Sequence, residues 1–368
     1  MAFNKSAVLI SFHLWKSKRK AGFHKIAESL MGLGYHVTFV TGSASFLSYI
    51  KGDYRTPLIK TAPKNKLVKV NDKLSTFVAF NTLHPVNMRN SILNNYSSLI
   101  FRNYRDLLLP FTDLINAIGK SELIIFESFP GLLWFDSLMS INPDAKFIYR
   151  VSDDIEFQNQ PPFIIQHEKE IAGKFDLVSV PSKFIFNKFR ANKNTRLHFH
   201  GIDKNKFDET NMNPYSQNNN FVFTGNSYFD FNFLRTASGV YPEIKFHIIG
   251  GINREVLSDN IIYYSERNFN DTIPFVKFAD AGLHTLEYSK GAESFSDSLK
   301  VMQYTYCRLP IISPGFIRSD RDNFIYYEYR NEKSIIQAID SALHFNRESI
   351  DTSNLLSWDD LTMKLITE

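Results

Sequence analysis

Two adjacent carboxylates follow a predicted strand in the first half of the chain. Asp153 and Asp154 come just after the predicted strand 146–151. Ligands bind beyond the carboxyl ends of the strands in open α/β sheets, and a carboxylate there could act as a general base toward an acceptor hydroxyl. Because the two are consecutive, only one can point into a given cleft. The alternative is that Ser152, Asp153 or Asp154 caps the start of the next helix.

A glycine turn follows a predicted strand in the second half of the chain. Thr224, Gly225, Asn226 and Ser227 end the apolar run that begins at Phe221. A glycine among small polar residues lets backbone amides approach a phosphate, and the start of a following helix favours the anion. We therefore expect a phosphate contact at this turn, although a tight connection between a strand and a helix needs the same residues.

A lysine and a glutamine share one face of a predicted helix. The segment DSLKVMQY at 297–304 begins with residues that cap helices, and it places Lys300 and Gln303 three residues apart. A lysine in the first turn is unfavourable to the helix dipole, so a bound anion would explain its presence. The alternative is a solvated lysine on an amphipathic helix.

The motifs of several other ligands are missing from the sequence. It contains neither GxGxxG nor GxxxxGK[ST], which argues against NAD and P-loop chemistry. Its histidines lack the spacing of a zinc site. The segment 320–322 has the DxD pattern of metal-dependent transferases, but it belongs to a polar loop. We expect no metal and no cofactor.

Short aliphatic runs alternate with helical periods along the chain. The expected strands are 7–12, 36–40, 123–126, 146–151, 177–180, 221–224, 245–249, 261–264, 281–285 and 310–313. The expected helices are 22–33, 102–118, 162–172, 231–238, 273–279, 299–307, 334–345 and 358–366, and residues 50–75 are expected to be irregular. This alternation predicts parallel sheets with right-handed crossovers.

The length of the chain and a polar interruption predict two domains. A chain of 368 residues exceeds the size at which a single core stops growing, and the Asn-rich stretch 215–220 interrupts the alternation. We expect an α/β protein with two Rossmann-like domains, 1–203 and 204–348, whose parallel sheets face a central cleft. Residues 349–368 are expected to form a C-terminal helix that crosses back to the first domain.

Basic residues are concentrated in the first third of the chain. Residues 1–120 contain 17 Lys and Arg against 5 Asp and Glu, a balance of +12, whereas the remainder has 25 against 33, a balance of −8. This asymmetry indicates an anionic partner. No nucleic-acid signature is present, so an anionic membrane surface or a phosphorylated acceptor fits better than nucleic acid. The alternative is a merely solvated basic face. The expected contacts are Lys16, Lys18, Arg19 and Lys20.

Cysteine usage and the N-terminal pattern bear on location. The single cysteine, Cys307, excludes an internal disulfide and suits a reducing cytosol. The apolar run 7–12 precedes the basic cluster 16–20, the reverse of the order in a signal peptide, and is too short to span a bilayer. We expect a cytoplasmic protein that is peripheral on the inner face of the cell membrane.

From Phe221 onward the chain resembles GT-B glycosyltransferases. The likeness lies in the Gly225 turn, in YPEIKFHIIGG at 241–251, in IPFVKFADAGLHTLEY at 273–288 and in SLKVMQYTYCRLPIIS at 298–313. HGIDKNKF at 200–207 resembles the segment that joins the two domains of these enzymes. Gln303 stands where ordinary members carry an acidic residue, which indicates a distinct subgroup.

Within that fold the chain resembles the GumK-like glucuronosyltransferases of exopolysaccharide assembly. The motifs are YRVSDD at 149–154, GNSYFDFNFL at 225–234, and Tyr288 followed by DSLKVMQY at 297–304. The resemblance implies inverting transfer from UDP-glucuronate to a polyprenyl-diphosphate-linked oligosaccharide at the inner membrane face. The first domain would then bind the acceptor and the second the nucleotide sugar. The loop between Tyr288 and Lys300 is shorter than in the family, in a region where several donor contacts should lie.

The resemblance also implies roles for individual residues. Asp153 is similar to the catalytic base, with Asp154 and Asp230 as supporting acidic positions, and Lys300 is similar to the lysine on the diphosphate. The expected donor-binding residues are Gly225, Asn226, Tyr288, Leu299, Lys300 and Gln303. Fold alone leaves two alternatives open: a retaining transferase or nucleotide-sugar epimerase, and a non-catalytic two-domain binding protein.

Overall fold

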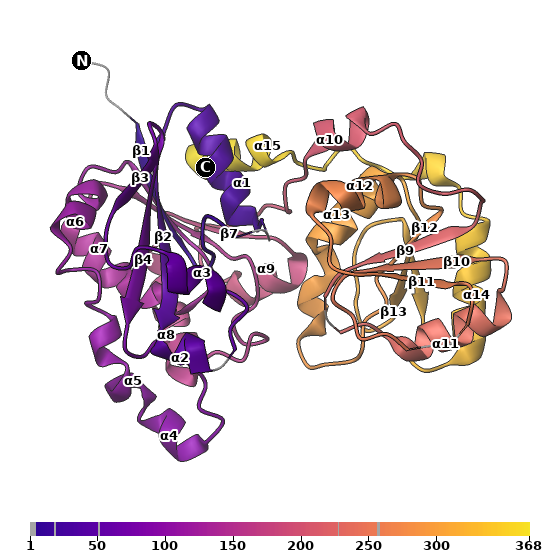
Figure 1. Ribbon diagram of the computed structural model, residues 1–368, viewed down its shortest axis with the longest axis horizontal. Helices are drawn as coiled ribbons and strands as arrows, with labels where there is room; N and C mark the ends of the chain where they lie inside the picture. The colour runs from indigo at the N-terminus through magenta and orange to yellow at the C-terminus, as the bar shows by residue number, and fades with distance from the viewer. Residues whose placement is uncertain (1–4, 18–19, 51, 227, 256–257) are drawn as a thin grey trace. The chain divides into compact units, whose positions relative to one another are not determined.

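The chain folds into two compact units, each built around its own sheet (Figure 1). The computed structural model describes residues 5–17, 20–50, 52–226, 228–255 and 258–368. Unit 1 comprises Met1–His198 and Trp358–Glu368, and unit 2 comprises Phe199–Ser357. The expected α/β fold with two mostly parallel sheets is confirmed.

The described strands of unit 1 form an eight-stranded sheet in the order β3-β4-β2-β1-β5-β6-β7-β8. They are β1 (Ser6–Ser11), β2 (His36–Ser45), β3 (Val68–Asn71), β4 (Leu74–Asn81), β5 (Leu123–Phe126), β6 (Lys146–Arg150), β7 (Leu177–Val180) and β8 (Thr195–Leu197). Neighbouring strands pair in parallel, except that β3 pairs antiparallel with β4 at one edge. Helices cover both faces of such a sheet, so its central strands are continuous apolar runs.

The helices of unit 1 connect these strands. They are α1 (Gly22–Gly32), α2 (Phe46–Ile50), α3 (Thr56–Thr61), α4 (Ser91–Asn95), α5 (Ser97–Ile100), α6 (Thr112–Ile118), α7 (Phe135–Ile141), α8 (Pro162–Ile171), α9 (Lys183–Phe189) and α15 (Trp358–Thr367). In α1 the residues that repeat every three or four positions are buried, among them Phe23, Ile26 and Leu30, and this stripe faces the core.

The last helix of the chain packs on the first. Figure 1 shows α15 beside α1, and the Ser29 hydroxyl donates to Asp359 at 2.5 Å. The Lys146 ammonium donates to the carbonyl of Ile366, and Glu368 pairs with His198 at 2.9 Å. The C-terminal segment therefore completes unit 1 although unit 2 precedes it in the sequence.

The described strands of unit 2 form a six-stranded parallel sheet in the order β11-β10-β9-β12-β13-β14. They are β9 (Asn220–Thr224), β10 (Lys245–Ile249), β11 (Ile261–Tyr264), β12 (Ala281–Leu283), β13 (Ile311–Pro314) and β14 (Phe324–Tyr327). The helices are α10 (Lys204–Glu209), α11 (Phe231–Val240), α12 (Phe269–Lys277), α13 (Leu299–Tyr306) and α14 (Glu332–Leu343).

Each sheet has one point at which the direction of winding reverses. In unit 1 the chain moves outward from β1 through β2 to β4, and then returns to β5 on the other side of β1. In unit 2 the reversal falls between β9 and β12. Ligands of open α/β sheets bind at such switch points, beyond the carboxyl ends of the strands. The loops that follow β1, β5, β9 and β12 are therefore the first places to look for a site.

Three predictions about local structure were wrong. The second strand does not end at Val40, before Thr41 and Gly42, but continues to Ser45. Gly42 serves close packing within it, since a Cβ there would lie 2.5 Å from Phe129. The range 102–118 is not one continuous helix: it begins with a short 3-10 helix, Arg102–Tyr104, and ends with α6, because proline at 110 lacks the donor that a continuous helix needs. The stretch 50–75 is not irregular, because it contains α3 and β3 and reaches the start of β4.

Candidate active site

A buried glutamate occupies the switch point of unit 1. Glu127 directly follows β5, and its side chain accepts hydrogen bonds from the Ser11 hydroxyl at 2.6 Å and from the Phe12 amide at 2.9 Å. Both donors belong to the carboxyl end of β1, the neighbouring strand. The loops after these two strands are therefore tied together through one carboxylate.

A histidine pairs with this glutamate. His13 Nε2 lies 3.5 Å from Glu127 Oε1. Burial lowers the pKa of His13, but the charge of Glu127 and the hydrogen bond to it outweigh burial, so this pKa is raised. Burial likewise raises the pKa of Glu127, and the contacts with His13, Ser11 and Phe12 reverse that effect and hold it below its usual value. Both shifts favour an imidazolium–carboxylate pair.

The loop after β6 carries Asp153 toward this pair. The Ser128 hydroxyl accepts the amide of Ser152 at 2.8 Å and that of Asp153 at 3.4 Å, and the Ser152 hydroxyl donates to Glu127 Oε1 at 3.4 Å. Asp153 itself is exposed. Burial by the surrounding protein raises its pKa to about 6, with the charge of Glu127 acting in the same direction and that of His13 against it. The exposed surface limits the effect of burial, but the effect of Glu127 remains.

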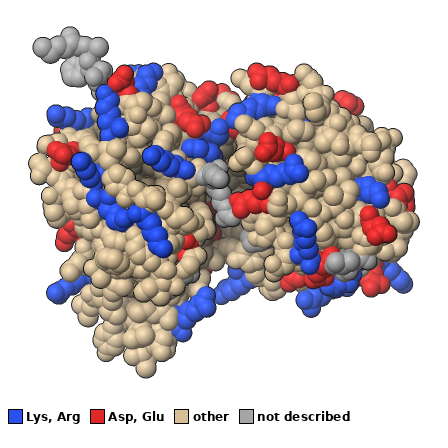
Figure 2. Space-filling model, in the orientation of Figure 1, with Lys and Arg blue, Asp and Glu red and all other residues tan. Residues whose placement is uncertain are grey.

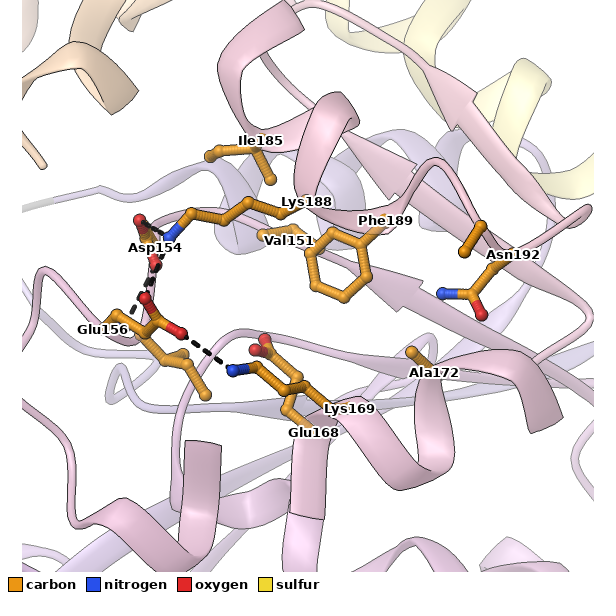
Figure 3. Close-up of a pocket in the computed structure, with 12 residues that line it drawn as sticks. Val151, Asp154, Glu156, Glu168, Lys169, Ala172, Ile185, Lys188, Phe189 and Asn192 are labelled. Carbon is orange, nitrogen blue, oxygen red and sulfur yellow. Dashed lines mark hydrogen bonds and ion pairs between the residues drawn. The ribbon is translucent and has the colours of Figure 1, made fainter. Parts of the chain in front are cut away.

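The neighbouring carboxylate, Asp154, points to the other side of the loop. It is buried, forms an ion pair with Lys188 and accepts the amide of Glu156 at 3.0 Å. Figure 3 shows Lys188 reaching both Asp154 and Glu156 across a pocket of about 190 Å³ between α8, α9 and the loop. Asp154 thus anchors the loop to α9, which leaves Asp153 as the exposed carboxylate of the two.

A glycine turn lies at the switch point of unit 2. Gly225 follows β9, and the Asn226 side-chain oxygen accepts the amide of Gly251 at 2.7 Å. Gly250 has φ of +143°, and a Cβ there would lie 1.8 Å from the Gly225 carbonyl oxygen. The loops after β9 and β10 therefore approach each other at a distance that only glycine permits. Ser227, which the sequence also singled out, lies outside the described residues.

Lys300 reaches this turn from the first turn of α13. Its Nζ lies 4.2 Å from the centre of the Phe223 ring, and a Cβ on Gly225 would be 3.7 Å from the same nitrogen. The helix is held by Tyr304, whose hydroxyl accepts the amide of Thr224 and donates to the Val222 carbonyl. Burial lowers the pKa of Lys300 to about 7. Within the described part of the chain, no carboxylate balances this ammonium.

The other predicted donor-binding residues lie around α13 and the loop after β12. Gln303 is buried, and Leu299 is half-buried beside the core. Tyr288 is exposed, with its ring edge-on to Phe316 at 5.2 Å. The structure therefore brings Gly225 and Lys300 together and leaves Tyr288 on the surface.

Asp230 faces the interior of unit 2. Its side chain is fully buried, caps α11 by accepting the amides of Asn232 and Phe233, and accepts the Tyr327 hydroxyl at 2.7 Å. These contacts occupy both carboxylate oxygens. The structure thus gives Asp230 the environment of a helix cap.

The basic cluster follows β1. Lys16 is exposed, and Lys20 lies over the Trp15 ring and donates to the Trp15 carbonyl. Lys18 and Arg19 lie outside the described residues. Across the residues that the structure describes, no group of three or more His, Cys, Asp or Glu side chains is arranged to hold a metal ion.

Comparison with known proteins agrees with this geometry. Residues 9–181 match the family described as glucuronosyltransferase GumK, N-terminal domain. A UDP-glucuronate:glycolipid 2-beta-glucuronosyltransferase from Xanthomonas campestris pv. campestris is 29% identical over 362 residues, covering 98% of this chain and 88% of the relative. The chain is a glycosyltransferase of the GT-B fold and is similar to the GumK glucuronosyltransferases. The expected resemblance is confirmed, and the non-catalytic alternative falls away.

Solved structures support the fold of this glycosyltransferase. A structure of Anabaena HepE in complex with UDP has a TM-score of 0.60 at 11% identity and is covered to 94%, with 98% of this chain aligned. A trehalose-6-phosphate structure from E. coli bound with UDP-2-fluoro glucose has a TM-score of 0.58 at 12% identity, with coverage of 98% of this chain and 95% of that one. At such low identity these likenesses establish the fold alone.

Two residues of this candidate site were not singled out in the sequence. Glu127 and His13 each come directly after an apolar strand, the same signal that singled out Asp153. The sequence alone does not say which strands are neighbours, so nothing indicated that the two side chains would meet. The order β1-β5-β6 supplies that information.

Proposed function

We propose that this glycosyltransferase moves glucuronic acid, with inversion, from UDP-glucuronate to a lipid-linked oligosaccharide in surface polysaccharide biosynthesis. Asp153 removes the proton from an acceptor hydroxyl while that oxygen bonds to the anomeric carbon and the bond to UDP breaks. The proton stays on Asp153, and the leaving diphosphate carries the negative charge. Unit 1 supplies the base and unit 2 holds the donor.

The observation that carries this proposal is the uncompensated ammonium of Lys300 beside the Gly225 turn. A diphosphate placed there neutralises the lysine and meets the backbone of a glycine turn, as phosphate sites at strand ends do. Lys300 then stabilises the charge that develops on the leaving group, which is the main electrostatic task in such a transfer. We propose that this cation, without a metal ion, balances the diphosphate.

A donor panel tests the proposal. Calorimetry with UDP, UDP-glucuronate, UDP-glucose and GDP-mannose should show the tightest binding for UDP-glucuronate. Lys300→Ala should weaken UDP binding roughly 30- to 160-fold, because it removes a charge-assisted contact worth about 2–3 kcal/mol. Lys333→Ala is the matched control, since Lys333 is also the second residue of its helix, α14, but is exposed. An equal loss of UDP affinity in both variants would overturn the proposed diphosphate site. Tighter binding of another sugar nucleotide would overturn the proposed donor.

An apolar surface supports a peripheral position on the membrane. The helices α4 and α5 carry exposed side chains at Ile92, Leu93, Tyr96, Leu99 and Ile100. Residues 91–100 contain no charge, and Figure 2 shows the corresponding lobe, at the lower left, almost free of charged side chains on the face in view. Exposed arginines flank it at positions 89 and 102. Among the described residues, no helix has the length and apolarity needed to cross a bilayer.

We therefore propose that α4 and α5 insert into the membrane interface. Apolar side chains flanked by basic residues bind such an interface, and each basic residue near an anionic leaflet adds about 1 kcal/mol. The double variant Ile92→Glu with Leu99→Glu should lose flotation with vesicles of phosphatidylcholine and phosphatidylglycerol. Met212→Glu with Val240→Glu, two exposed apolar residues of unit 2, should float like the wild type. Unchanged flotation of the first variant would contradict the proposal.

Retention is the remaining alternative for the stereochemistry. An exposed carboxylate at a strand end favours direct attack by an activated acceptor, which inverts the anomeric centre. NMR of the product should therefore show a β-linked sugar from the α-linked donor. An α-linked product would establish a retaining transferase instead.

A further inference from the structure

The surroundings of Asp153 contain two groups for which the proposed reaction has no use. Glu127 and His13 are mostly enclosed, with side chains 6% and 21% exposed, and form an ion pair at the switch point of unit 1. A buried ion pair is weak support for stability, because its desolvation offsets its attraction. Its position at a strand-end site therefore needs another explanation.

We propose that Glu127 and His13 form a charge pair that positions Asp153 and adjusts its proton affinity, with both acting as positioning residues. The inference rests on the proposed role of Asp153 as the base. Neither residue is assigned contact with the acceptor or with the donor.

The positioning part follows from hydrogen bonds that converge on Glu127. Its two oxygens accept Ser11 and Phe12 from the end of β1 and Ser152 from the end of β6. Ser152 precedes Asp153 directly, so the orientation of the base depends on the loop that Glu127 holds. The amide of His13 donates to the Ser11 hydroxyl at 3.1 Å, which closes the network on the β1 side.

The electrostatic part follows from the opposite signs of the two partners. The negative charge of Glu127 disfavours ionisation of Asp153, and the positive charge of His13 favours it, with Glu127 the stronger of the two. A base is most effective when its proton affinity is matched to the working pH. Because Glu127 is the stronger partner, the pair acts in the same direction as burial, which is the largest cause, and raises the proton affinity of Asp153.

Other charged and titratable groups packed around the pair also shift the pKa values of His13 and Asp153. Arg55, whose guanidinium donates to the Phe12 carbonyl, disfavours the charged form of His13. The ring of His24 lies 5.8 Å from that of His13, but burial lowers the pKa of His24 to about 4, so it is neutral. On the Asp153 side, Asp154 disfavours ionisation and a hydrogen bond from Gln158 favours it. These groups remain constant when only Glu127 or His13 is changed.

The first test is a direct titration that needs no substrate. In protein labelled with ¹³C at aspartate carboxyl carbons, the Asp153 resonance is identified by its loss in Asp153→Asn. Glu127→Gln removes the stronger repulsion, so the titration midpoint of Asp153 should fall by about half a pH unit or more. His13→Gln removes a favourable charge, so the midpoint should rise. The double variant should return toward the wild type.

Matched controls separate this effect from a general disturbance. Glu122→Gln is the same change just before the amino end of β5, and His36→Gln is the same change at the start of β2. Both positions lie at the amino ends of their strands, the end of the sheet opposite to the loop that carries Asp153. Neither variant should therefore move the titration midpoint of Asp153. Equal midpoints in all variants, or movement of Glu127→Gln and His13→Gln in the same direction, would overturn the inference.

The second test connects the pair to turnover. The acid limb of kcat/KM against pH is measured with UDP-glucuronate. It should move to lower pH in Glu127→Gln and to higher pH in His13→Gln, as the NMR midpoints do. Glu127→Asp keeps the charge and should restore the wild-type limb, which a purely structural role would not predict. If the NMR midpoints move but the acid limb does not, then the pair acts as inferred and Asp153 is not the base. That outcome would overturn the proposed reaction role alone.

Discussion

The two candidate sites of this glycosyltransferase handle charge in opposite ways. In unit 1 the exposed Asp153 interacts with the charges of the Glu127–His13 ion pair, and its neighbour Asp154 forms an ion pair with Lys188. In unit 2 the ammonium of Lys300 lies beside an aromatic ring and a glycine turn, and no carboxylate of the described residues balances it. Within the part of the chain that the structure describes, the site in unit 1 contains its own counter-charges, whereas the lysine in unit 2 has none.

This difference matches the tasks that we propose for the two sites. A base must hold a fixed proton affinity before any substrate arrives, so its compensating charges have to be part of the protein. A site for a diphosphate gains affinity when the ligand itself supplies the missing charge. The comparison thus predicts that changes in unit 1 alter turnover and its pH dependence, whereas changes at Lys300 alter binding.

Removal of the proposed base is expected to have the largest effect. Asp153→Asn should lower kcat about 10²- to 10⁴-fold, which is the usual contribution of a general base. Its affinity for UDP should stay within about twofold, because unit 2 is untouched. Initial rates of transfer and calorimetry with UDP measure the two quantities on one preparation.

The adjacent carboxylate provides the control for that variant. Asp154→Asn breaks the ion pair with Lys188 and loosens the loop, so it should cost stability and only part of the activity. If Asp154→Asn were as inactive as Asp153→Asn while remaining folded, the assignment of the base to Asp153 would fail. Wild-type turnover in Asp153→Asn would show that another group is the general base, and Glu127 would be the first candidate.

The lysine in unit 2 predicts a pH dependence of nucleotide binding. Burial holds the pKa of Lys300 at about 7 in the free protein, and a bound diphosphate should raise it. Between pH 7 and 9 binding then takes up a proton, so UDP affinity should fall by up to about tenfold per pH unit. The terminal phosphate of UDP, with a second pKa of about 6, is already ionised in that range. Calorimetry in two buffers of different ionisation enthalpy measures the uptake directly.

An arginine at the same position sharpens this test. Lys300→Arg keeps its charge at every pH used, so its UDP affinity should be nearly flat from pH 7 to 9. Lys333→Arg on the exposed surface of α14 should keep the wild-type slope. A wild-type slope in Lys300→Arg would show that another group takes up the proton.

Much of this architecture could be predicted from sequence because parallel strands buried on both faces are short apolar runs. The segments 7–12 and 123–126 stand out for that reason, and they form most of β1 and β5. Prediction failed where tertiary packing decides. Gly42 reads as a strand terminator, but it lies within β2 because the Phe129 ring fills the space of its missing side chain. The partner ring is 87 residues away, so no local pattern contains it.

The candidate site was predictable only residue by residue. Lys300 was found because a cation in a first helical turn is unusual, and Asp153 because it follows a strand. What each residue contacts depends on strand order, which is a long-range property. The Glu127–His13 pair and the different environments of Asp153 and Asp154 therefore emerge only from the fold.

Asp230 provides the smallest expected effect on turnover and contrasts two buried carboxylates. Like Glu127 it accepts several hydrogen bonds, but its partners are the first turn of α11 and the Tyr327 hydroxyl. Asp230→Ala should therefore cost about 2–4 kcal/mol, the sum of a lost cap and an unpaired buried hydroxyl. Hydrogen exchange should rise in peptides from α11 and β14 and stay unchanged in those from β1 and β5. Asp230→Asn keeps the cap, so it should recover part of the stability, and folded protein of either variant should keep kcat within about threefold. A loss of turnover with normal hydrogen exchange would instead give Asp230 a role in catalysis. Asp230 in unit 2 would then no longer be a purely structural carboxylate, in contrast to Glu127 in unit 1, which adjusts the pKa of Asp153.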